Sequence, residues 1–230
     1  MLSENSMYRT LSALAASLFI AAAAVSAAQA LPQADEPVVG LPGMRDSLER
    51  PVGDLFELPE GVELVEPILS YSFFDEKECR HPDQEKPTQV LGNPAGAVQL
   101  CLVFNNKTRG PINVGFPPGI IVESESTEVQ NGMLIQTASI EIDAPQVFVK
   151  LIFDCTNVSR SAPTGISGVR YRLGPVTRHP HIVEALRLLA DRDLSNQLDG
   201  ARASAILGEL YDGDPLTARL RADIASLPAA

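Results

Sequence analysis

The chain has 230 residues, of which 45% are hydrophobic, 20% charged and 5% aromatic. This composition is typical of an ordinary globular protein and argues against a disordered, collagen-like or coiled-coil chain. With 18 Lys and Arg against 29 Asp and Glu, the formal net charge is −11, which repels phosphate backbones and anionic lipid surfaces. We therefore expect no nucleic-acid partner.

An apolar, alanine-rich run covers residues 11–28, near the start of the chain. It leads into Ala28-Gln29-Ala30, whose small side chains fit the pocket of a signal peptidase. We interpret residues 1–30 as a signal peptide cleaved before Leu31, with a cut after Ala27 as the nearest alternative. The other interpretation is a membrane anchor, because about 18 apolar residues is the lower limit for spanning a bilayer. The sequence thus predicts export, in bacterial style, to the periplasm or the medium, with no membrane span after cleavage.

The mature part of the chain begins with a segment rich in turn-forming residues. Prolines and glycines dominate residues 31–61, which predicts an extended arm. Residues 62–174 alternate short apolar runs with turn residues. The clearest predicted strands cover residues 62–74, 98–104, 133–142, 146–154 and 169–173. Because no helical pattern separates these strands, we expect them to pair in antiparallel fashion.

After Pro175 the apolar spacing changes from that of strands to that of helices, as in Ile182, Leu186 and Leu189. Residues 175–230 are therefore predicted to form a helical segment packed on the β domain of residues 62–174. The predicted fold is mainly β: an antiparallel β-sandwich, either immunoglobulin-like or a small barrel, with a C-terminal group of two or three short α-helices.

Three cysteines in an oxidising compartment predict one disulfide and one free thiol. Cys101 lies in the middle of the apolar run 98–104, where a buried thiol fits well. Cys79 and Cys155 each lie just past the end of a predicted strand. The sequence therefore favours a Cys79–Cys155 disulfide. The rival Cys101–Cys155 has the separation of an immunoglobulin bridge, but the chain has no Trp to accompany it.

The chain has only three histidines, and they lie in two charged segments. His81 follows a run of acidic residues, and His179 and His181 flank a proline. If the two segments met, these three side chains and a carboxylate could bind zinc or copper. The alternative interpretation is that all three are ordinary surface-loop and helix-cap residues.

Four aromatic residues could belong either to the core or to a contact surface, and the core is favoured because large apolar side chains are usually buried. They are Tyr71, Phe73, Phe74 and Phe116.

The sequence contains no G-x-S-x-G, P-loop, H-E-x-x-H or C-x-x-C motif, and it indicates no catalytic or cofactor-binding residue. The leading hypothesis is an exported, non-enzymatic β protein that serves as a binding, adhesion or envelope-associated structural module with a protein or envelope partner. One alternative is a metal-binding exported protein that uses His81, His179 and His181. The other is a hydrolase whose carboxylates come together only in the fold.

Overall fold

The structure is a computed structural model of the chain, and it describes residues 40–72, 74–75, 78–81, 88–163 and 165–230. The predicted signal peptide, the first residues of the arm and Phe73 lie outside these ranges. The strands are β1 (Gly53–Asp54), β2 (Val62–Leu64), β3 (Ile68–Ser70), β4 (Gln89–Gly92), β5 (Val98–Asn106), β6 (Ile112–Phe116), β7 (Ile120–Ser124), β8 (Gly132–Met133), β9 (Ala138–Ile142), β10 (Gln146–Cys155) and β11 (Arg170–Thr177). The helices are α1 (Pro180–Leu189), α2 (Gln197–Gly208) and α3 (Ala218–Ala225).

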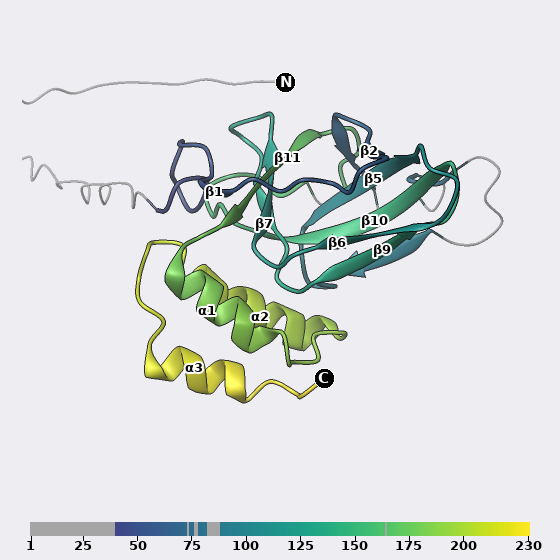
Figure 1. Cartoon of the computed structure of the whole chain (residues 1–230). Coiled ribbons are helices and arrows are strands. Elements are labelled where there is room, and N and C mark those ends of the chain that lie inside the picture. The colour runs from purple at the N-terminus through teal and green to yellow at the C-terminus, as the bar shows by residue number, and fades with distance from the viewer. Residues whose placement is uncertain (1–39, 73, 76–77, 82–87, 164) are drawn as a thin grey trace, which may run out of the picture. The chain divides into compact units, whose positions relative to one another are not determined.

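Six of these strands close into a barrel. Its order is β5, β3, β11, β7, β8 and β10, and β10 pairs again with β5. Figure 1 labels β5, β7, β10 and β11 of this barrel. Pairing around the barrel is antiparallel, and the additional strand β4 lies parallel to β10. The prediction of a mainly β fold followed by short helices is confirmed in this form. Of the two options within it, the closed sheet fits the small barrel, and two facing sheets of a sandwich are not seen among the described residues.

The barrel interior follows from the alternation of side chains along its two longest strands. On β5 the buried side chains are Val98, Leu100, Leu102 and Phe104, and on β10 they include Val149, Leu151 and Phe153. The two-stranded sheet of β6 and β9 packs against the same core through residues such as Phe116 and Ile140. Burial of each such side chain contributes about 1.5–3 kcal/mol, so this alternation fixes which face of each strand turns inward.

A second hydrophobic cluster joins the three helices to one side of the barrel (Figure 1). It contains buried side chains from every helix, together with Ile121 of β7 and Met133 of β8. Asn196 and Thr217 cap α2 and α3 by accepting hydrogen bonds from the backbone N–H groups of Asp199 and Leu220. No helix in the described part of the chain is long and apolar enough to cross a membrane.

The described part of the arm, residues 40–61, is held in place by buried amides. The carbonyl oxygen of Gly43 accepts hydrogen bonds from Asn131 Nδ2 at 3.0 Å, Thr156 Oγ1 at 3.1 Å and Asn157 Nδ2 at 3.2 Å. Met44, the next residue, is 2% exposed and belongs to the helix cluster. The arm is therefore part of the packed structure and links the barrel to the helices.

Candidate binding groove

The disulfide joins Cys79 to Cys101, with a Cα–Cα distance of 5.3 Å, and Cys155 is a free thiol. The predicted Cys79–Cys155 pairing is therefore wrong. Alternation along β5 explains the error, because the even-numbered residues around Cys101 point into the barrel and Cys101 itself points outward. There it meets the loop that follows β3. Cys155 instead ends β10 opposite Gly132 and packs against the barrel core.

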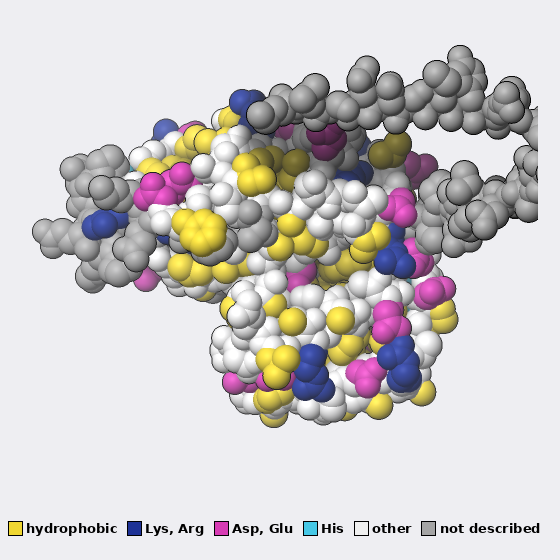
Figure 2. Space-filling view, turned by 180° about the vertical axis from the view of Figure 1, so that it is seen from behind, with side chains coloured by type: hydrophobic (Ala, Val, Ile, Leu, Met, Phe, Trp, Pro, Cys, Tyr) yellow, Lys and Arg dark blue, Asp and Glu magenta, His cyan; other side chains and the backbone are white. Residues whose placement is uncertain are grey.

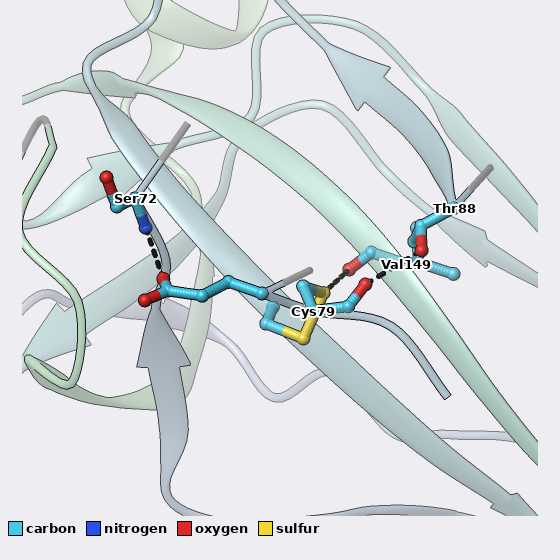
Figure 3. Close-up of a disulfide and its surroundings, with 6 residues drawn as sticks. Ser72, Cys79, Thr88 and Val149 are labelled. Atoms are coloured by element: carbon cyan, nitrogen blue, oxygen red, sulfur yellow. Dashed lines mark hydrogen bonds between the residues drawn. A yellow bond between two sulfur atoms is a disulfide. The ribbon is translucent and has the colours of Figure 1, made fainter. Parts of the chain in front are cut away.

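Cys79 and the described residues near it are held against the outside of the barrel (Figure 3). Thr88 Oγ1 donates a hydrogen bond of 2.8 Å to the Cys79 carbonyl, and the sulfur of Cys79 lies 3.5 Å from the carbonyl oxygen of Val149 on β10. The backbone N–H of Ser72 donates a 2.6 Å hydrogen bond to the carboxylate of Glu78. These contacts, with the disulfide, hold the described loop residues against β5 and β10.

Between this loop and the barrel lies a mainly apolar groove of about 330 Å³. Its apolar lining comes from Val65, Leu69, Val103 and Phe148, together with the disulfide. Val65 and Leu69 are 40% and 43% exposed, and because they line the same groove they form an apolar patch instead of singly exposed side chains. The outer surface of the barrel is accordingly not uniformly polar, and Figure 2 shows hydrophobic side chains across it on one face of the molecule.

The rim of the groove is polar and carries both signs of charge. Glu78 and Arg80 line it, and the ammonium group of Lys150 lies 4.9 Å from the centre of the Tyr71 ring. Burial raises the pKa of the Tyr71 phenol to about 12, so it stays neutral at physiological pH. An apolar floor with a charged rim is the usual layout of a surface that binds a protein segment.

The aromatic residues considered in the sequence divide between core and surface. Tyr71 and Phe116 are 4% and 0% exposed, whereas Phe74 is 80% exposed. Phe148, which lines the groove, was not among the residues singled out in the sequence. The signal that could have found it is its place in the strand 146–154, on the face opposite to the buried valine and leucine.

The predicted histidine cluster is not brought together in the described structure. The ring of His81 packs edge-on against Phe148 at 5.8 Å, whereas His179 and His181 lie next to each other at the start of α1, with ring centres 5.8 Å apart. Among residues with described positions, no group of three or more His, Cys, Asp or Glu side chains is arranged to hold a metal ion. The described structure therefore offers no site for a metal ion at these histidines, and metal binding by them stays a prediction.

His179 also borders a second apolar pocket, of about 350 Å³, lined by Leu41, Met44 and Val52 of the arm. Burial, with a smaller contribution from His181, lowers the pKa of His179, so its ring is neutral at pH 7. Its Nδ1 atom is buried and finds no hydrogen-bond partner in the described part of the chain. This pocket is the main alternative to the groove as a contact surface.

Neither the free thiol nor the most strongly perturbed carboxyl group is placed for chemistry on a substrate. Burial raises the pKa of Cys155 to about 11, which keeps the thiol protonated and unreactive at neutral pH. Asp154 is 2% exposed and lies under α2, so a substrate in solvent does not reach it.

Comparisons of the chain with protein-family models, with curated proteins and with solved structures found no match.

Proposed function

We propose that this chain is an exported, non-enzymatic binding module that contacts a partner protein through the groove beside the Cys79–Cys101 disulfide. The observation that carries the proposal is the solvent-open apolar groove on the outside of a closed barrel. A barrel that only needed to be stable would place polar side chains there. The disulfide is compatible with an oxidising compartment, either periplasmic or extracellular, which agrees with the predicted signal peptide.

The groove favours a partner segment that presents two or three apolar side chains. Its volume of about 330 Å³ is at the low end of the range for binding pockets. Val65, Leu69 and Phe148 offer apolar contact, and the mixed charges of Glu78 and Arg80 offer hydrogen bonds at the rim. Such a segment would gain affinity from a few buried anchors, as is usual for protein interfaces.

The two alternatives have less support. A metal-binding function would need His81, His179 and His181 in one place, and the described residues hold no such cluster. A hydrolase would need a carboxyl group of suitable acidity in an open site, and the carboxyl group whose pKa is raised to about 7, that of Asp154, is covered by α2.

The test is a selection of random linear peptides, displayed on phage, on the purified mature protein. We expect enriched peptides to carry closely spaced apolar residues and to compete with one another for one site. Leu69→Glu should weaken their binding by at least about tenfold, because it replaces an apolar contact in the floor of the groove with a charged side chain that must lose hydration when a peptide covers it.

Leu198→Glu is the matched control, because Leu198 is 72% exposed and lies on α2, outside the groove. Circular dichroism and thermal unfolding would establish that both variants fold. Selected peptides that bind the Leu69→Glu variant as well as the wild type, or a selection that enriches no apolar peptide, would refute the proposal. If Val52→Glu weakens peptide binding and Leu69→Glu does not, the binding site is the pocket beside His179.

A further inference from the structure

A buried polar cluster joins α2 to the barrel, and Asp154 lies at its centre. Oδ1 of Asp154 accepts hydrogen bonds from Asn93 Nδ2 at 2.8 Å and from the hydroxyl of Ser204. Asn93, in the connection between β4 and β5, also donates to the carbonyl of Gly200 at 3.2 Å. The contact with Gly200 is close, because a Cβ atom there would lie 2.1 Å from Asn93 Oδ1. These contacts seat the Gly200–Ser204 face of α2 on the end of β10.

The cluster supplies too few donors for a charged carboxylate. Asn93 has two amide hydrogens, and these are shared among Asp154, Gly200 and Ser204. Ser204 has one hydroxyl hydrogen, for which Asp154 and the Gly200 carbonyl compete. The second oxygen, Oδ2 of Asp154, is buried and has no hydrogen-bond partner among the described residues, and the same holds for the hydroxyl of Tyr211. A proton on Oδ2 would remove the charge and turn an orphaned acceptor into a donor.

No cation in the described residues compensates Asp154. The titratable groups whose charges interact with it are Cys155 on the barrel and Tyr211 in the segment after α2, and neither carries a positive charge. The charged side chains at the start of α2, Asp199 and Arg202, form an ion pair with each other at 3.1 Å. Burial raises the pKa of Asp154 from its ordinary 3.8 to about 7, although the hydrogen bonds from Ser204 and Asn93 oppose this rise.

We propose that Asp154 is a pH-sensitive latch, whose protonation below neutral pH tightens the docking of the helical unit on the barrel. In the docked state the neutral acid is favoured, because Asp154 is buried and no cation among the described residues faces it. When α2 moves away, Asp154 reaches water and ionises at its ordinary acidity. Opening of α2 therefore becomes easier as the pH rises between the two pKa values and levels off above the higher one.

The test is amide hydrogen exchange of the full chain at several pH values, with labelling times scaled for intrinsic exchange. From about pH 5 to about pH 8, we expect the opening constant of the amides in Gln197–Gly208 to increase on the order of 100-fold in the wild type. In Asp154→Asn, which has no group to ionise, the increase should be less than about threefold. Asp143→Asn, in the exposed turn before β10, is the control and should keep the wild-type dependence.

A second measurement covers the case in which Asp154→Asn does not fold. Carbon NMR of the side-chain carboxyl groups in the wild type should show one aspartate that titrates near pH 7, against an ordinary value of 3.8. An Asp154 midpoint close to the ordinary value would overturn the proposal, and so would helix protection that does not change with pH in the wild type. Helix protection that changes equally in Asp154→Asn would assign the effect to another group and refute the latch.

Discussion

Removal of the Cys79–Cys101 disulfide should destabilise the protein by about 3 kcal/mol. The two cysteines are 22 residues apart in the sequence. Joining them restricts the unfolded chain, and the chain-entropy relation gives about 11 cal/mol/K for a loop of this length, or about 3 kcal/mol at 25 °C. The variant to use is Cys79→Ala with Cys101→Ala, because it removes the bridge without leaving two thiols. Both positions lie on the outside of the barrel, so the change leaves the buried alternation of β5 intact.

Urea unfolding followed by circular dichroism would measure this loss. With a urea slope of about 1–3 kcal/mol per molar, the midpoint should fall by roughly 1–3 M. Cys155→Ser is the matched control, since it removes the free thiol and keeps the bridge. Reducing agent should destabilise this control by the same amount and leave the double alanine variant unchanged.

Thiol counting separates this pairing from the alternatives. Native wild-type protein should react slowly with iodoacetamide, because burial raises the pKa of Cys155 to about 11. In urea it should expose one thiol per chain, and Cys155→Ser should expose none. A peptide map with Cys155 in a bridge, or a double alanine variant as stable as the wild type, would refute the reasoning.

Three further predictions concern the packing of α2 and of the arm. Gly200→Ala should destabilise the protein by about 1–3 kcal/mol in thermal unfolding, because the new Cβ would lie 2.1 Å from Asn93 Oδ1. Gly208→Ala should instead stabilise α2 by up to about 1 kcal/mol, because a Cβ there meets no described atom outside its own helix within 4 Å. Asn157→Ala should lower the free energy of unfolding in urea by about 2–3 kcal/mol. It removes a buried donor to the Gly43 carbonyl and leaves the backbone N–H of Asn131 without its acceptor. A loss below about 0.5 kcal/mol would contradict this prediction.

The interior of the barrel could be predicted from the sequence, because alternation is a local property. In β10, Val149, Leu151 and Phe153 are buried at the period of two that the sequence shows, whereas Ile152 and Asp154 of the opposite face are buried as well near the end of the strand. The same rule applied to the run 98–104 would have placed Cys101 outside. An interpretation of the run as apolar throughout misses this alternation and leads to the wrong disulfide. A cysteine between two buried leucines faces away from them whenever the segment is a strand.

The order of strands and the docking of the arm could not be predicted, because they depend on partners distant in sequence. Asn131 precedes a glycine and has the local signature of a turn, yet it is 4% exposed and donates to Gly43, 88 residues away. Proline and glycine in residues 31–61 disfavour long helices and strands, and β1 has only two residues, but they do not exclude tight packing. The arm is held by the buried carbonyl group of Gly43, which requires hydrogen-bond donors. Only the folded structure shows which side chains supply them.

The outward row of β10 connects the two proposed sites. Phe148 on this row lines the groove, and Asp154 on the same face lies beneath α2. Phe148 and Asp154 are six positions apart, which is roughly 20 Å along an extended strand. Sites this far apart usually do not couple. The described part of β10 between them is paired with β5 along its length, which opposes any independent movement of the strand. We therefore expect Leu69→Glu to weaken peptide binding without changing the pH dependence of α2. Asp154→Asn should remove that pH dependence and leave peptide binding unchanged, so either proposal can fail while the other stands.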